Sequence, residues 1–217
     1  MDTKAMQDDP DWDPTYSTGY FHGVLECPRT PCGNNCIVAG SWKADYVDDV
    51  DVDPVGQVLD DYLSVNYVFP ALPLMEYPDG VPDRIRDPIS AASMVILSDA
   101  SAAANRIRSA IEALLDCQNV RKLQAGKRTS RLKTHARIEL YMAKNPRAAA
   151  HLMAMKWIGN VGSHERDPLP LSMVLDGMEH FAKAVELIYD RHEKALERRA
   201  VQINQLGHKL RAPKAKA

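Results

Sequence analysis

Apolar residues recur at spacings of three and four along the chain after Pro82, and this periodicity constrains the fold more than any other feature. One stripe consists of Ile85, Ile89, Ala92, Val95 and Ile96, and a second consists of Ala104, Ile107, Ile111, Leu114 and Leu115. Residues three and four apart lie on one side of a helix. The periodicity therefore predicts helices that pack their apolar faces together, which is a mainly α fold.

Five helices are expected in a bundle that spans residues 81–206. The first carries the stripe that ends at residue 96. The second runs from about residue 101 to residue 117, with Asp99 or Ser101 as its N-cap, since Asp and Ser side chains accept hydrogen bonds from the first helical N–H groups. The third is expected over residues 132–143.

The last two helices are predicted from capping residues and from amphipathic spacing. Asn145 and Pro146 start the fourth helix as its cap and first position, because proline lacks the N–H group that would be unpaired there. Gly159 and Gly162 are expected to loosen or end this helix. The fifth is predicted as one long amphipathic helix over residues 171–206.

A small β module is expected ahead of the bundle, in residues 19–80. Short apolar pieces between Tyr20 and Trp42, broken by Pro and Gly, predict a hairpin that contains cysteines. Residues 45–61 are acidic and are expected to form a loop, whereas residues 62–69 have strand-like content. Residues 1–18 are rich in Asp without periodicity, which predicts a disordered acidic arm.

Length and composition are typical of a folded domain. The chain has 217 residues, with 45% hydrophobic and 26% charged residues, so it is long enough for one sizeable domain. No apolar run approaches the roughly 20 residues that cross a bilayer. The acidic start has no apolar core of the kind found in secretory signals. We therefore expect a cytoplasmic protein without a membrane segment.

The formal net charge of −2 conceals a strong asymmetry. Residues 1–61 hold thirteen Asp or Glu against three Lys or Arg, whereas residues 121–137 hold seven basic residues and no acidic one. Residues 191–217 hold eight basic and two acidic residues, and 207–217 are expected to form a disordered basic tail. Two interpretations stay open: solvated surface, or surface that binds phosphates. The candidates for nucleic-acid binding are Arg121, Lys122, Lys127, Arg128, Arg131 and Lys133.

Three of the four cysteines lie within ten residues. Cys27, Cys32 and Cys36 have the spacing C-x4-C-x3-C, and His22 precedes them. Zinc prefers four thiolate or imidazole ligands in a tetrahedron, so these four residues are candidates for a structural zinc site. Free, partly buried thiols and a disulfide between Cys27 and Cys32 remain the alternatives.

Two polar segments are candidates for a functional site. In the second helix Asn105, Arg108 and Glu112 share one face, so Arg108 and Glu112 are expected to pair. This pair is either an exposed ion pair or an arginine held toward a site. The chain contains no phosphate-binding GxxxxGKS/T loop, no GxSxG and no HExxH, so common nucleotidase, hydrolase and zinc-protease mechanisms find no support.

The second segment combines Lys156, Asn160 and His164 with two glycines. A histidine moves protons near neutral pH and a cation stabilises a phosphorane, so this set has the groups for metal-independent cleavage of RNA. The alternative is structural: Asn160 caps a helix end and His164 bonds to the backbone. His135, within the basic stretch, is the next candidate imidazole.

Residues 20 to about 200 resemble the bacterial domain-of-unknown-function family 4145. The resemblance rests on four pieces: Leu25-Glu-Cys-Pro with Cys32-Gly, the connector Pro70-Ala-Leu-Pro with Val81-Pro, the helix Ala104–Leu115, and Gly159-Asn-Val-Gly-Ser-His164. Such domains look like relatives of the HEPN helical bundles and are associated with bacterial defence and restriction systems. The resemblance thus implies a HEPN-like five-helix bundle.

HEPN ribonucleases place a short R-x(4–6)-H motif in a dimer of such bundles. Asn160 and His164 match the polar residue and the histidine, but Gly159 stands at the arginine position. A missing charge donor typically costs about 100- to 1000-fold in rate, and the remaining candidates for it are Lys156, Arg108 and Arg166. The resemblance implies a homodimer that binds RNA or DNA and is a candidate metal-independent endoribonuclease. A non-catalytic adaptor that binds a partner protein of a defence system is the alternative.

Overall fold

The computed structural model describes residues 10–29, 32–48, 57–126, 129–164 and 169–207, without the side chains of residues 48, 57, 159–164 and 191–194. The chain forms two compact units. Unit 1 consists of Met1–Pro73 with Ser90–Ala103, and unit 2 of Leu74–Ile89 with Ala104–Ala217. The predicted mainly α fold with a small β module is confirmed. Within the described residues, every helix is too short or too polar to cross a lipid bilayer.

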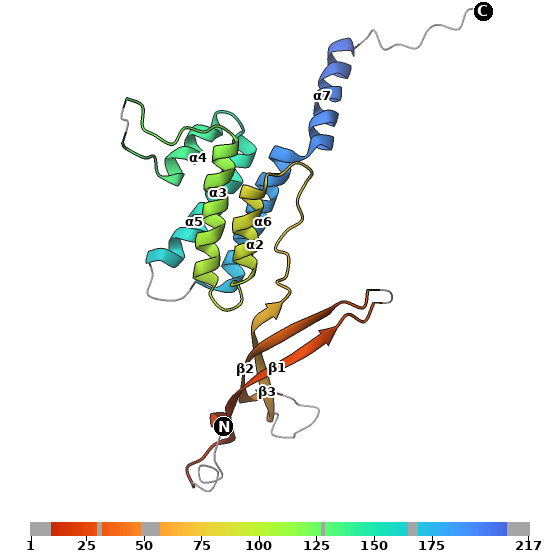
Figure 1. The fold of residues 1–217 in the computed structure, drawn as a ribbon, viewed down its shortest axis with the longest axis vertical. Coiled ribbons are helices and arrows are strands. Elements are labelled where there is room, and N and C mark those ends of the chain that lie inside the picture. Colours follow the sequence, from red (N-terminus) through yellow and green to blue (C-terminus); the bar gives the residue numbers. More distant parts are fainter. Residues whose placement is uncertain (1–9, 30–31, 49–56, 127–128, 165–168, 208–217) are drawn as a thin grey trace, which may run out of the picture. The chain divides into compact units, whose positions relative to one another are not determined.

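Unit 1 contains a three-stranded antiparallel sheet with the order β1-β2-β3 (Figure 1). Its strands are β1 (Thr18–Glu26), β2 (Asn35–Asp48) and β3 (Gln57–Phe69), and a 3-10 helix, η1 (Pro14–Tyr16), precedes them. The prediction of a loop over residues 45–61 was wrong at both ends. Pairing of β2 with β3 supplies backbone hydrogen bonds that the acidic composition did not reveal.

Two glycines let aromatic rings lie against the sheet. Gly19 pairs with Trp42 and Phe21 pairs with Gly40 across β1 and β2. A Cβ at Gly19 would lie 2.5 Å from Trp42 Nε1, and one at Gly40 would lie 2.9 Å from Phe21 Cε1 and overlap the Ser64 carbonyl oxygen. Each ring thus packs over the backbone of the opposite strand, where a side chain would not fit.

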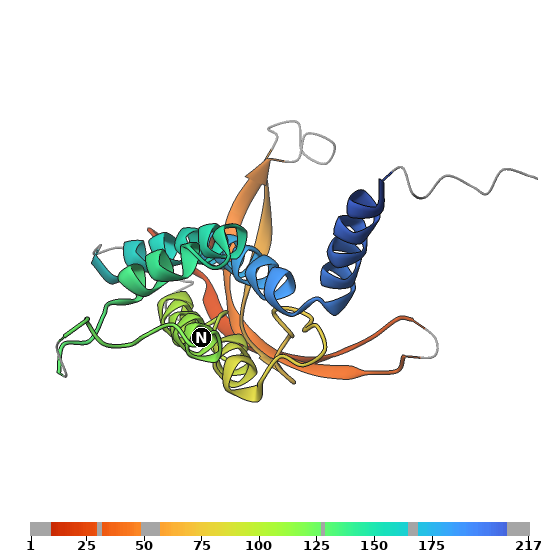
Figure 2. The same cartoon turned by 90° about the horizontal axis from the view of Figure 1, so that it is seen from above.

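Helices α2 (Asp83–Ser93) and α3 (Ala100–Cys117) each contribute residues to both units, whereas four further helices belong to unit 2 alone. These are α4 (Thr134–Met142), α5 (Pro146–His164), α6 (Leu171–Tyr189) and α7 (Arg191–Leu206). Helices α5 and α6 lie side by side (Figures 1 and 2). The large side chains buried in unit 2 include Ile85, Ile107, Ile111, Leu114, Ile138, Tyr141, Leu152, Met155 and Phe181.

Both predicted helix caps are present. The Asp99 carboxylate accepts a hydrogen bond from the Ala102 N–H at 2.7 Å, and the Asn145 side chain accepts one from the Ala148 N–H at 3.0 Å. These bonds satisfy N–H groups that have no partner inside the helix. Local sequence therefore fixed where α3 and α5 begin.

The prediction of a single helix over residues 171–206 was wrong. The chain breaks at Asp190, whose backbone is extended (ψ 108°), so α6 ends at Tyr189 and α7 starts at Arg191. Aspartate favours the position before a helix, which explains the break. Gly159 and Gly162 were expected to loosen or end the fourth helix, and they do not end it, since α5 continues to His164. Six α-helices therefore occur among the described residues, and a five-helix bundle is not confirmed.

Candidate functional site

The chain between α3 and α4 folds back on itself as a two-armed loop, here named the basic finger (residues 121–126 and 129–133). An antiparallel bridge joins Leu123 to Arg131. Two backbone hydrogen bonds flank it, from the Leu132 N–H to the Lys122 oxygen at 2.8 Å and from the Gln124 N–H to the Ser130 oxygen at 2.9 Å. The bonds hold the two arms together, so cations from both arms occupy one small region.

A carboxylate at the end of α3 anchors the base of the basic finger. Asp116 accepts a hydrogen bond from the buried Arg137 of α4 at 2.6 Å and lies 2.7 Å from the Lys122 ammonium group. Arg137 also donates to the Val120 carbonyl oxygen at 3.0 Å. The network links α3, the first arm of the finger and α4. Its centre is the Arg137 side chain, which is only 5% exposed.

The pKa of the Asp116 carboxyl reflects this network. Burial alone would raise this pKa, but hydrogen bonds and charge from Lys122 and Arg137 outweigh burial and hold it below the ordinary value of 3.8. The carboxylate is therefore ionised throughout the neutral range. Because Arg137 is buried and bound to Asp116, it does not contribute to the exposed basic surface that the charge run indicated.

Three predicted nucleic-acid contacts are exposed on the finger: Arg121, Arg131 and Lys133. Lys122 is 60% exposed but is paired with Asp116. The other two predicted contacts, Lys127 and Arg128, lie outside the described residues. No acidic residue occurs between residues 121 and 137, so the finger carries positive charge that its own sequence does not neutralise.

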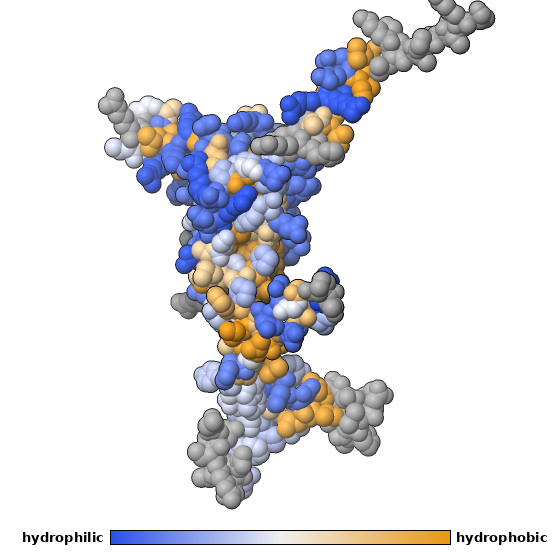
Figure 3. Space-filling model, turned by 45° about the vertical axis from the view of Figure 1, so that its right-hand side comes forward, coloured by the Kyte–Doolittle hydropathy of each residue, from blue (hydrophilic) through white to orange (hydrophobic). Residues whose placement is uncertain are grey.

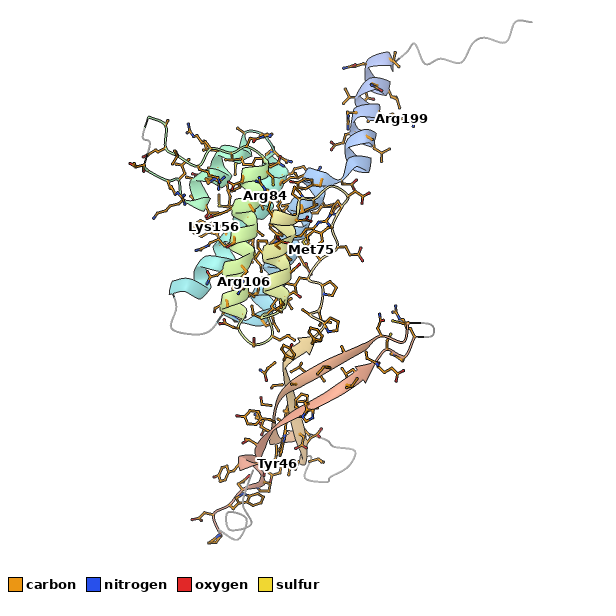
Figure 4. The ribbon with its side chains drawn as sticks, in the orientation of Figure 1. Tyr46, Met75, Arg84, Arg106, Lys156 and Arg199 are labelled. Carbon is orange, nitrogen blue, oxygen red and sulfur yellow. The ribbon has the colours of Figure 1, made fainter. Side chains whose placement is uncertain are left out.

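Trp157 of α5 contacts two polar side chains, one from its own helix and one from α4. The Lys156 ammonium group lies 3.5 Å from the centroid of the Trp157 ring. The His135 ring of α4 meets the indole edge to face, with centroids 5.6 Å apart and an interplanar angle of 67°. His135 also lies 3.4 Å from Glu139. Figure 4 shows Lys156 on the side of unit 2 that α4 and α5 form.

The catalytic candidates are only partly described. Asn160 and His164 lie on the helical backbone at the end of α5, and their side chains lie outside the described residues. Asn160 and His164 therefore belong to the helix itself. Glu112 accepts a hydrogen bond from the Thr134 hydroxyl at 2.8 Å, which ties it to the start of α4. Arg108 is half-buried on α3.

The sequence interpretation missed a histidine pair between α5 and α6. His151 Nδ1 lies 3.1 Å from His180 Nδ1, so one ring donates a hydrogen bond to the other. Burial, His180, Lys183 and Arg147 lower the pKa of His151 below 6.5. The spacing of Arg147 and His151, four residues apart on one helix, was the available signal. His180 comes from another helix, and no local pattern links it to His151.

A groove elsewhere in unit 2 has the opposite charge to the finger. Among the side chains that the structure describes, Lys183 is the one basic residue that lines it, and its other polar neighbours are mostly carboxylates. These are Glu76, Asp79, Glu179, Glu186 and Asp190. Phosphate groups are repelled by such a lining, so the finger is the better candidate for binding nucleic acid.

The cysteine hairpin brings two of the predicted zinc ligands together. Hydrogen bonds from the Asn34 N–H and from the Cys27 thiol lower the pKa of the Cys32 thiol. Cys36 pairs with Leu25 on one face of the hairpin, whereas His22 pairs with Ala39 and lies on the other face. His22 is therefore not brought to the cysteines. Within the described residues, no group of three or more metal-binding side chains is assembled.

Comparison with known proteins identifies a family for the helical part. Residues 90–206, just over half of the 217-residue chain, match the model of the family described as Domain of unknown function (DUF4145). No curated protein and no solved structure gives a significant match. The match covers the basic finger and all of α3 to α7.

Proposed function

The chain belongs to the DUF4145 family, and from that premise we propose that it is a nucleic-acid-directed protein that binds RNA in a bacterial defence or toxin-like role. The defence role follows the resemblance to HEPN-like domains. Binding of RNA rests on the chemistry of unit 2, in which the basic finger supplies cations to the phosphate backbone. Phosphate contacts of this kind supply most of the affinity of non-specific nucleic-acid binding.

The observation that carries this proposal is the finger itself. Arg121 on one arm and Arg131 and Lys133 on the other are exposed, and the bridge between Leu123 and Arg131 keeps the arms adjacent. Cations held on a hydrogen-bonded loop lose less conformational freedom on binding than cations on a flexible tail. The acidic first third of the chain is unsuited to the same task.

Fluorescence anisotropy with a labelled, unstructured RNA at several salt concentrations tests the proposal. The triple variant Arg121→Ala, Arg131→Ala, Lys133→Ala is expected to bind more weakly. Because each lost phosphate contact removes about 0.7 from the slope of log K against log salt, the slope should fall by about 2. A matched triple variant of exposed cations elsewhere in unit 2, Arg106→Ala, Arg147→Ala, Arg198→Ala, changes the net charge equally. Equal slopes for the two triple variants would contradict the proposal.

RNA cleavage is the catalytic extension of the proposal. In it His164 moves the proton, Asn160 orients the reacting group, and Lys156 and Arg108 stabilise the phosphorane charge. The helical spacing of residues 156, 160 and 164, four apart along α5, supports their acting together. Purified protein is compared with His164→Ala. Equal cleavage by both proteins, or cleavage by neither, removes the catalytic extension and leaves RNA binding.

Self-association is the second candidate function, and α7 favours it. Leu196, Ile203 and Leu206 are 53%, 46% and 48% exposed and share one side of this helix. Figure 3 shows hydrophobic residues gathered along one side of α7. Exposed apolar stripes of this kind mark contacts between proteins. We propose that the occupant is α7 of a second copy, which makes the protein a homodimer.

A further inference from the structure

An exposed tryptophan is the most unusual surface feature of unit 2. Trp157 is 55% exposed, although it belongs to α5, whose neighbours Leu152 and Met155 are buried. The exposed part of the indole is a large, planar, apolar surface that an incoming group can contact. A planar ring in this position presents a surface on which another planar group can stack.

The neighbours of Trp157 are polar and cationic. Lys156 lies over the ring at 3.5 Å from its centroid, and His135 meets the indole at 5.6 Å between centroids. The Nδ1 atom of His135 is buried without a hydrogen-bond partner. That atom is closed to solvent, so it is not a contact for an incoming ligand. Glu139 engages the other nitrogen of this ring.

The basic finger leads directly into this cluster. Lys133 is the last residue of the finger, α4 starts at Thr134, and His135 follows. Thr134 is held to α3 by its 2.8 Å hydrogen bond to Glu112, which fixes the start of α4. The exposed residues Arg131 and Lys133 therefore lie four and two residues before His135, whose ring contacts Trp157.

We propose that Trp157 is the stacking site for an unpaired base of RNA whose phosphates lie along the basic finger. This inference rests on the RNA-binding function proposed above. Proteins that bind single strands combine a basic surface that follows the backbone with aromatic rings that stack on bases, and both parts are present here. The base stacks on the part of the indole that stays exposed, while Lys156 supplies a positive charge over the ring and the edge-to-face contact with His135 supports the indole from α4.

The same tryptophan in a protein interface is the competing interpretation, because interfaces are enriched in Trp. The surroundings favour RNA. The centres of protein interfaces are depleted in lysine, whose hydration shell must be removed on association, whereas Lys156 contacts the indole directly and Arg131 and Lys133 lie close along the chain. A phosphate backbone instead gains from each of these charges.

The test measures the affinity of the full chain for a short, labelled oligouridylate at several salt concentrations. Trp157→Ala is expected to weaken binding roughly 5- to 150-fold, the range for loss of one stacked base. The salt slope should stay at the wild-type value, since stacking releases no counterions. Trp157→Phe, which keeps a smaller ring, should bind with intermediate affinity. Tyr20→Ala, which removes a 92% exposed ring from unit 1, is the control and should bind as wild type.

A second readout follows the indole directly. In a Trp12→Phe, Trp42→Phe background, Trp157 is the only tryptophan, and its fluorescence should be quenched by oligouridylate and not by inorganic phosphate. If Trp157→Ala binds with wild-type affinity, the inference is wrong. It is also wrong if the salt slope of Trp157→Ala falls as it does for the triple variant of the finger, because the substitution would then have distorted the finger. If Trp157→Ala dissociates a dimer and leaves RNA binding unchanged, Trp157 belongs to a contact between proteins and the inference is also wrong. If the finger variant alone is defective, the proposed function stands and the stacking site does not.

Discussion

At the scale of single residues, Asp116 connects more parts of unit 2 than any other polar side chain described above. It receives Arg137 from α4 at 2.6 Å and Lys122 from the finger at 2.7 Å. The two partners differ in exposure, since the Arg137 side chain is 5% exposed and that of Lys122 is 60% exposed. Loss of the interaction with Arg137 should therefore lower the stability of the fold much more than loss of the interaction with Lys122.

Asp116→Ala is expected to lower the free energy of unfolding by about 3 kcal/mol, because it leaves the buried Arg137 guanidinium with only the Val120 carbonyl oxygen as partner. Urea denaturation of the purified variant measures this change. Lys122→Ala is the control and should cost less than about 1 kcal/mol, as exposed ion pairs do. Equal losses of unfolding free energy in the two variants would contradict this prediction, because burial of the Arg137 charge would then make no difference.

At the scale of helices and strands, the contact between α5 and α6 depends on the protonation of His151. Its pKa lies below 6.5 in the folded chain, because burial, His180, Lys183 and Arg147 all disfavour the charged ring. Two of these cations have carboxylate partners: Lys183 lies 2.8 Å from Glu186, and Arg147 lies 3.9 Å from Glu197 of α7. A lowered histidine pKa means that the unfolded chain takes up a proton first as the pH falls.

The His151 contribution to stability should thus be complete above pH 6.5 and should fall as the pH drops from 6.5 toward the folded-state pKa. Urea unfolding of the wild type and of His151→Gln across this range measures it. The difference in unfolding free energy between the two proteins should change with pH below 6.5 and be constant above it. His22→Gln, an exposed histidine of unit 1, is the control. A pH-independent difference for His151→Gln would refute this prediction.

In the sheet, Gly40→Ala should destabilise the pairing of β2 with β3 by about 2 kcal/mol, since the new Cβ overlaps the Ser64 carbonyl oxygen, a backbone atom that moves only with its strand. Faster hydrogen exchange of the β2 and β3 amides reports this loss. Gly23→Ala is a matched control on β1, because nothing lies within 4 Å of its added Cβ. Similar exchange rates in both variants would argue against the close approach at Gly40.

Sequence predicted the elements of unit 2 better than those of unit 1, for a physical reason. Helices depend on contacts three and four residues apart, and caps such as Asp99 and Asn145 are local, so both are visible in the sequence. Strand β3 pairs with residues about twenty positions away, and its aspartates argue against a strand. The break at Asp190 was missed because apolar spacing continues on both sides of it.

The candidate site shows the same limit. The run of cations from Arg121 to Lys133 was evident from the sequence, and the structure adds the bridge that turns it into a finger. The contact of Trp157 with His135 joins residues twenty-two positions apart on two helices, so no periodicity predicted it. Burial of Arg137 was likewise hidden, because a charge run does not reveal which member has a buried partner.

At the scale of the whole molecule, the exposed side of α7 predicts self-association. The full chain is expected to have twice the monomer mass in light scattering, and Leu196→Glu with Ile203→Glu should return it to the monomer mass, since charges on the apolar stripe oppose helix pairing. Gln205→Glu adds a charge at an exposed residue outside the apolar stripe and should leave the mass unchanged. A wild-type chain of monomer mass at micromolar concentration would remove the homodimer.

The closed base of the finger has a consequence for how this protein can diversify. Because the Leu132 N–H bonds to the Lys122 oxygen below the Leu123–Arg131 bridge, the strain of a longer or shorter tip stops at that bond and does not reach the ends of α3 and α4. Lengthening a surface loop adds little free energy, about 0.6 kcal/mol for each doubling. The residues between the two arms can therefore change in number and type while the ends of α3 and α4 keep their structure.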